Sequence, residues 1–254
     1  MATRSPRPEA LRTTDDAILG GRLRLLQPAD GHRVGHDAVL LAAAAPTAIH
    51  AIDLGAGVGA AGLALLARGV AERATLVEID PELAALAREN AARNGFGERT
   101  AVFTADISKL GRMKTKLADS DLVILNPPFN DPARRKGSPQ ASRRRAHAAA
   151  DTELASWLNA AERALAADGS MVLIHRPEAL ETILAALAGR FGAAAIIPIF
   201  PRPHAAAIRV IVHAIKGRRT PPELRSGLTL NGADGRPSAE AEAILRGGGP
   251  LEPA

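Results

Sequence analysis

The sequence contains no cysteine and no tyrosine, and aromatic residues make up only 2% of it. Without cysteine the chain has no disulfide framework, no zinc–thiolate site and no cysteine nucleophile. This absence fits a reducing compartment, so we expect a cytoplasmic protein. Because aromatic side chains are so few, Ala, Leu, Val and Ile must fill the core of this 254-residue chain, whose hydrophobic content is 46%.

Long apolar runs and lysine are also scarce. No apolar run reaches the roughly 18 residues that a membrane-spanning helix needs, and we expect no membrane association. The first nine residues lack the apolar stretch of a signal peptide.

Arginine supplies most of the 32 basic residues, and the net charge is +5. Arginine suits phosphate recognition, which favours a nucleic-acid partner, although a GC-rich genome would also enrich arginine and alanine.

Apolar runs alternate with helical periodicity through most of the chain. We expect a disordered tail over residues 1–17, one α/β domain over 18–216 and an irregular extension over 217–254, helical only at 240–246. Strands are predicted at 22–27, 48–54, 74–79, 100–104, 121–125, 171–175, 194–200 and 208–215. Helices are predicted at 37–45, 60–68, 82–94, 152–167 and 177–190.

This alternation predicts a mostly parallel sheet of seven strands with helices on both faces. The last two strands are joined by the Pro-rich turn 201–204, which is too short for a helical crossover. One strand near the end of the chain should therefore run antiparallel to the others.

A glycine-rich turn, Asp53-Leu-Gly55-Ala-Gly57-Val-Gly59, follows the first long apolar run and opens a helix. Glycine lets the backbone turn sharply and approach a ligand closely. The overlapping segment 57–62 also matches a dinucleotide fingerprint, with Glu78 about 20 residues further on. Glu78 and Asp106 end the next two strands, so the three acids should share one edge of the sheet.

Asn126-Pro127-Pro128-Phe129 ends the fourth strand of this series. An amino group conjugated to a ring is a poor nucleophile, because its lone pair is delocalised. The Asn126 side-chain oxygen and the Pro127 carbonyl could each accept one N–H hydrogen and free that lone pair, while Phe129 could stack on a base. The motif therefore predicts an exocyclic amino nitrogen as the substrate group.

Together these motifs resemble the class I S-adenosylmethionine-dependent methyltransferases that act on amino groups, which have a Rossmann-like fold. Segments 31–42, 175–177, 196–203, 207–210 and 230–246 are similar to the tRNA1(Val) adenine-N6 methyltransferase family. The resemblance implies methyl transfer from S-adenosylmethionine to adenine N6 in tRNA beside the anticodon.

The resemblance also implies roles for individual residues. Glu78 would hold the cofactor ribose, Asp106 with Ile107 its adenine, and Asp53, Gly55 and Gly57 would shape the site for the methionine part. Arg33 and Asp37 would close over it. No metal is expected, because the sulfonium is already activated and the enzyme need only align the reacting atoms.

The polar segment 130–150 is expected to be a basic loop that contacts RNA. Its basic residues are Arg134, Arg135, Lys136, Arg143, Arg144 and Arg145. RNA phosphates would neutralise these charges, whereas a solvated surface loop is the alternative.

Other functions remain open at this point. Guanine N2 in ribosomal RNA and a protein glutamine side chain are alternative amino acceptors. An NAD-dependent oxidoreductase would use the glycine-rich turn but leaves Asn126-Pro-Pro-Phe129 unexplained. A non-catalytic RNA-binding module would not need Asn126.

Overall fold

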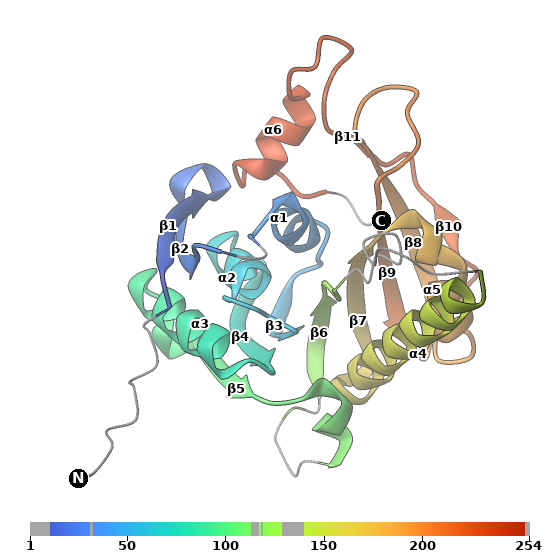
Figure 1. Ribbon diagram of the computed structural model, residues 1–254, viewed down its shortest axis with the longest axis horizontal. Coiled ribbons are helices and arrows are strands. Elements are labelled where there is room, and N and C mark those ends of the chain that lie inside the picture. The colour runs from blue at the N-terminus through green and yellow to red at the C-terminus, as the bar shows by residue number, and fades with distance from the viewer. Residues whose placement is uncertain (1–10, 31–32, 113–116, 118, 129–139, 252–254) are drawn as a thin grey trace.

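The computed structural model describes residues 11–30, 33–112, 117, 119–128 and 140–251, with the backbone alone at 110–112 and 140–151 (Figure 1). Its centre is a nine-stranded sheet in the order β10-β8-β9-β7-β6-β3-β4-β5, with β11 also paired to β8. The long strands are β3 Ala48–Leu54, β4 Ala71–Glu78, β5 Thr100–Thr104, β6 Ser120–Leu125, β7 Leu165–His175, β8 Phe191–Phe200 and β9 Arg209–Lys216.

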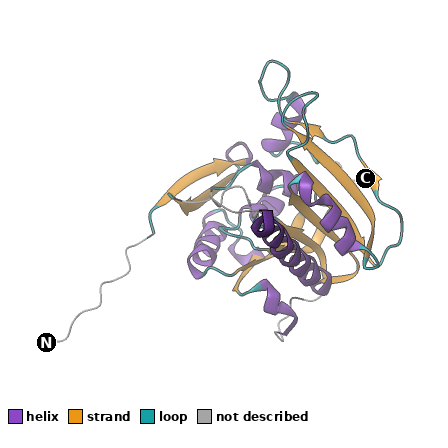
Figure 2. Cartoon of the chain, turned by 45° about the vertical axis from the view of Figure 1, so that its right-hand side comes forward, coloured by secondary structure: helices purple, strands orange, loops and turns teal. Residues whose placement is uncertain are grey.

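Helices cover both faces of this sheet, as the two buried clusters show. One cluster joins the sheet to α1 His36–Ala43, α2 Ala60–Ala67, α3 Pro81–Arg93 and α6 Ala239–Leu245. The other joins it to α4 Gln140–Ala164 and α5 Leu180–Leu187, which cross the sheet in Figure 2. In the part of the chain that the structure describes, no helix combines the length and the apolar character needed to cross a membrane.

The predicted strand directions are confirmed. Strands β3 to β7 pair in parallel, and β9 is antiparallel to both of its neighbours, β7 and β8. Two short strands, β10 Glu223–Leu224 and β11 Leu228–Thr229, add to β8 in parallel and make nine strands of the expected seven. The parallel strands therefore end at one edge, which carries the predicted motifs.

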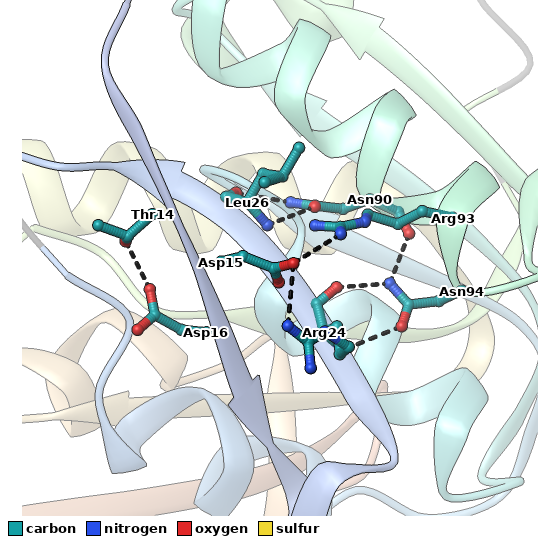
Figure 3. A network of polar contacts seen from close by, with 8 residues as sticks. All are labelled: Thr14, Asp15, Asp16, Arg24, Leu26, Asn90, Arg93 and Asn94. Carbon is teal, nitrogen blue, oxygen red and sulfur yellow. Dashed lines mark hydrogen bonds and ion pairs between the residues drawn. The ribbon is translucent and has the colours of Figure 1, made fainter.

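The expected disordered tail over 1–17 is wrong for residues 13–17. Strand β1 Thr13–Ile18 pairs in antiparallel fashion with β2 Leu23–Pro28 and forms a separate hairpin beside α3. The sequence of β1 is mostly polar, so it gave no apolar pattern from which a strand could be predicted. Ion pairs help to hold this strand instead. Asp15 pairs with Arg24 at 3.0 Å and with Arg93 of α3 at 2.8 Å (Figure 3).

The expected basic loop over 130–150 is wrong for residues 140–150, because α4 begins at Gln140 rather than at Thr152. Alanine, arginine and glutamine are strong helix formers, so this charged segment continues the helix. Residues 129–139 lie outside the described part of the chain, and so do the side chains at 140–151.

The extension expected to be irregular over 217–254 is integrated into the domain over its described residues, 217–251. The predicted helix at 240–246 is confirmed as α6, which packs on α1 and buries Ala241 and Ile244. Arg22, between β1 and β2, donates to the Gly247 carbonyl at 3.0 Å and to the Ala67 carbonyl at 2.7 Å. The two ends of the domain therefore meet over α2. The sequence did not predict that this extension packs on the domain, because two-residue strands are too short to show periodicity.

Candidate active site

The predicted motifs meet at the carboxyl edge of the sheet. Leu54 of β3 pairs with Leu125 of β6, so Gly55 and Asn126 each come one residue after a paired position. Neighbouring strands lie about 4.8 Å apart, which brings the glycine-rich turn beside the Asn126 motif. Glu78 ends β4, the strand on the other side of β3.

Glu78 fixes the glycine-rich turn from β4. Its side chain is 7% exposed, and its two carboxylate oxygens accept from the Gly57 and Asp80 backbone N–H groups, both at 2.8 Å. A carboxylate oxygen has two lone pairs, so each can still accept a second donor. This acid therefore joins two loops of the site and remains able to bind a ribose hydroxyl.

Asp53 is buried beneath the same turn, at 2% exposed. Its Oδ2 accepts from the Gly62 N–H at 2.8 Å, one of the N-terminal donors of α2 that have no partner within the helix. Burial raises the pKa of Asp53 to about 7, and the nearby Glu78 charge adds to this rise against the Gly62 hydrogen bond. Asp53 therefore supports the turn from below.

The glycines of the turn serve different purposes. A side chain at Gly55 would collide with the Trp157 ring of α4, so this glycine permits close packing of a helix. Gly57 has a φ of +56°, and a Cβ there would meet nothing within 4 Å. Open space above Gly57, beside a buried acid, fits a bound cofactor. Trp157 was not singled out from the sequence, because its closeness to the turn arises only in the fold.

Asp106 follows β5 and is more open than the other two acids. Its Oδ1 accepts from the Ser108 N–H at 2.9 Å and from the Ser108 hydroxyl at 2.7 Å. The Ser108 hydrogen bonds, with a smaller contribution from Lys109, lower the pKa of Asp106. Ile107 is partly buried at the start of the 3-10 helix Ile107–Arg112 and packs against the α4 side of the core.

Arg33 and Asp37 are held by other parts of the chain. The Arg33 guanidinium pairs with Asp16 of β1 at 2.7 Å. Asp37, in the first turn of α1, pairs with Arg209 at 2.8 Å. Arg209 begins the antiparallel strand β9, so this second pair lies at the carboxyl edge near the predicted site.

Asn126 is partly exposed, Pro127 is buried and Pro128 is exposed. Among the described residues, none is hydrogen-bonded to the Asn126 side chain. Phe129, Arg134, Arg135 and Lys136 lie outside the described residues, and Arg143, Arg144 and Arg145 fall in the part of α4 whose side chains are not described. Their predicted roles stay predictions.

His175 ends β7, next to the strand that carries Asn126. Burial is the largest cause that lowers the pKa of this imidazole, and the charges of Arg176 and Arg209 act in the same direction. A neutral imidazole can accept a proton. His175 had been noted only within a similar segment, because nothing in the sequence places it beside Asn126.

A separate groove of about 380 Å³ lies between the hairpin and α3. It is lined by Leu11, Thr13, Leu26, Glu82, Ala85, Leu86 and Glu89. None of these residues belongs to the predicted site. The chemistry expected from the motifs is therefore assigned to the carboxyl edge and not to this groove.

Comparison with known proteins identifies the family. Residues 33–197 match the methyltransferase small domain, so the chain belongs to that family. A tRNA1(Val) (adenine(37)-N6)-methyltransferase from Klebsiella pneumoniae is 37% identical over 147 residues, which are 56% of this chain and 58% of that protein. The chain thus aligns with little more than half the length of this relative.

A solved structure is similar over a larger share of both chains. It is a predicted O-methyltransferase from Agrobacterium tumefaciens, 30% identical, with a TM-score of 0.68 over 85% of this chain and 98% of that one. A SAM-dependent O-methyltransferase from Thermotoga maritima, 18% identical with a TM-score of 0.52 over 75% of this chain and 68% of its own, supports the fold alone.

Proposed function

We propose that this chain transfers the methyl group of S-adenosylmethionine to the N6 amino group of an adenine in tRNA. Its membership of the methyltransferase small domain family agrees with the family predicted from the sequence, with S-adenosylmethionine as the methyl donor. The observation that carries the proposal is Asn126-Pro127 at the end of β6, one strand from the glycine-rich turn. The name of the Klebsiella pneumoniae relative supports tRNA and adenine N6.

The residues present fit the cofactor. Glu78 would take the ribose hydroxyls and Asp106 the adenine amino group, while the turn over Asp53 would take the methionine part above Gly57. When bound, S-adenosylmethionine supplies a methyl group already activated by the sulfonium. The residues of the chain then need to hold the target nitrogen in line with that methyl group.

Asn126 and Pro127 would prepare the target nitrogen. Their two oxygens would accept its two hydrogens and turn its lone pair away from the ring, toward the cofactor side of the sheet edge. Pro127 is buried, and its own ring and that of Pro128 restrict the backbone on either side of its carbonyl. After methyl transfer the nitrogen carries an extra proton, which the imidazole of His175 at the end of the neighbouring strand β7 could accept, since burial lowers its pKa.

The name of the Agrobacterium tumefaciens structure makes O-methylation the second candidate. A substrate hydroxyl has one hydrogen to donate, whereas Asn126 and Pro127 offer two oxygens that can each accept one hydrogen of an amino group. The Asn126 motif therefore favours an amino group as the methyl acceptor. Guanine N2 and the side-chain amide of a protein glutamine also present an NH2 group to the motif, as adenine N6 does. They differ from adenine in the molecule that carries this group.

One experiment separates these acceptors. Total tRNA would be incubated with the protein and S-adenosylmethionine bearing a deuterated methyl group, digested to nucleosides and analysed by mass spectrometry. We expect labelled N6-methyladenosine, formed far more slowly when Asn126→Ala replaces the wild type. Label in N2-methylguanosine or in an O-methylated nucleoside would replace the adenine assignment, and unlabelled tRNA would reject tRNA as the substrate.

A further inference from the structure

Asn90 of α3 is a completely buried polar side chain, with 0% exposure. Its Nδ2 donates to the Leu26 carbonyl at 2.9 Å and to the Val58 carbonyl at 3.0 Å. Its Oδ1 accepts from the Leu26 N–H at 2.7 Å. One amide therefore joins α3, strand β2 and the glycine-rich turn, and Figure 3 shows it reaching Leu26.

Asn94, one helical turn further on, binds β2 in the same way but does not reach the glycine-rich turn. Its Oδ1 accepts from the Arg24 N–H at 2.9 Å, and its Nδ2 donates to the Arg24 carbonyl at 2.7 Å (Figure 3). The second carbonyl that Asn94 binds is that of Asn90, in its own helix. The two asparagines thus satisfy the edge of β2 where a further strand would otherwise pair.

The Val58 carbonyl lies at a sensitive point of the turn. It stands between Gly57 and Gly59, whose φ values are +56° and +89°. The turn is held by Glu78 at the Gly57 N–H, by Asp53 at the Gly62 N–H and by Asn90 at the Val58 carbonyl. Of these three groups, Asn90 alone comes from an element that carries no predicted ligand contact.

The same strand also supports the other side of the predicted cofactor site. Gln27, next to Leu26, accepts from the Val34 N–H at 2.8 Å and donates to Asp16 at 2.7 Å. Asp16 in turn pairs with Arg33. Strand β2 therefore connects, through Asn90, the glycine-rich turn to the segment before α1 that carries Arg33.

We propose that Asn90 is a positioning residue for the cofactor site, which holds the glycine-rich turn in its binding geometry through the Val58 carbonyl. The inference rests on the proposed function, in that the turn binds S-adenosylmethionine. Without the Asn90 amide, the buried Val58 carbonyl loses its hydrogen-bond donor. The peptide group that joins Val58 to Gly59 can then rotate. The cofactor would then meet a turn that must be reordered on binding, which lowers affinity.

Asn94 offers a matched control, because it is the same residue type at the C-cap of the same helix and has the same two contacts to β2. Asn90→Ala and Asn94→Ala would be compared with the wild type in urea unfolding and in calorimetric binding of S-adenosylhomocysteine. Both variants should lower stability. Asn90→Ala alone should raise the Kd by roughly tenfold, the effect of removing one hydrogen bond. In turnover, it should raise the KM for S-adenosylmethionine more than it lowers kcat.

Asn90→Leu keeps the buried volume filled and replaces Asn90→Ala if that variant does not fold. Equal Kd values for the Asn90 variant and Asn94→Ala would overturn the inference and leave Asn90 as a stabilising residue only. A wild type that fails to bind S-adenosylhomocysteine would instead reject the proposed function. The two failures are therefore distinguishable in one set of measurements.

Discussion

The two halves of the carboxyl edge are built differently. On the side of β3 and β4, the acids Asp53 and Glu78 are buried and already accept backbone N–H groups of the turns they support. On the side of β6, Asn126 is partly exposed and has no hydrogen-bond partner among the described residues. The first half is thus organised before a ligand binds, while the second presents polar groups to a substrate. Each half can be disturbed separately.

The largest effect is expected at Asn126. Asn126→Ala should lower kcat on the order of 10²–10³-fold, by analogy with the loss of one oxyanion-hole donor, because one acceptor for the target amine is removed. The Kd for S-adenosylhomocysteine should stay unchanged, since the cofactor half is not touched. Single-turnover methylation and calorimetry measure the two quantities. Near-normal turnover would show that this motif is not the amine site.

The next effect is expected at Gly57. Gly57→Val should raise the Kd for S-adenosylmethionine by at least about tenfold, because the new side chain fills the space expected for the cofactor. Gly69→Val is its control, since Gly69 has a φ of +71° and equally open surroundings at the opposite edge of the sheet. Both variants should lose about 1–3 kcal/mol of stability from strain. Equal cofactor affinity in both would remove Gly57 from the site.

A third effect concerns the pH dependence of stability. The pKa of Asp53 is raised from 3.8 to about 7 by burial, so the folded state binds this proton more tightly than the unfolded state. The free energy of unfolding should therefore fall as pH rises from 4 to 7, on the order of a few kcal/mol, and then level off. Asp53→Asn should remove this fall, because a neutral amide oxygen can still accept from Gly62.

Asp16 should give stability the opposite pH dependence to Asp53. Its hydrogen bonds from Thr14 and Gln27, with the charge of Arg33, lower its pKa, so its contribution is present above the unfolded pKa and lost as pH falls. Asp16→Asn should therefore cost stability at neutral pH and little in acid. Urea unfolding across the pH range checks both variants, and parallel curves for the wild type and Asp53→Asn would contradict the role of Asp53.

The smallest effect is expected in the basic segment at the start of α4. Replacing Arg143, Arg144 and Arg145 together by alanine should weaken RNA binding and lower its salt dependence, by a slope of about 0.7 for each phosphate that is no longer bound. Cofactor affinity should not change. Binding isotherms over a salt series give the slope, and an unaltered slope would assign these residues to a solvated surface.

The sheet was predictable because its strands are short apolar runs buried on both faces. Strands β3 and β5 matched their predictions residue for residue, and the others differed mainly at their ends. Strand β1 was not predictable, because its alternating polar residues are held by partners such as Arg93, far away in sequence. The early start of α4 was missed because a run of like charges was given more weight than helix propensity.

For the candidate site, the sequence predicted that the ends of β3, β4 and β6 lie at one edge of the sheet, but not how their side chains are engaged. Glu78 and Gly57 are 21 positions apart, and their hydrogen bond depends on the turn that both help to form. Asn90 gave no signal at all, since an asparagine in a helix is normally read as a surface residue. Its role follows from burial against strand β2 and the glycine-rich turn, which only the folded chain brings together.

The hydrogen bond of Arg22 to the Gly247 carbonyl has a consequence for how the protein is made. It spans 225 positions, and Leu251 also donates to the Ala43 carbonyl at 2.8 Å. Interactions between distant parts of a chain form slowly, because a long loop must first be closed. During synthesis, the β1–β2 hairpin with Arg22 is therefore made long before Gly247, whose carbonyl accepts the Arg22 hydrogen bond. The domain can be completed only after residue 251 has been added, and a chain stalled near residue 240 would expose the apolar surface of α1.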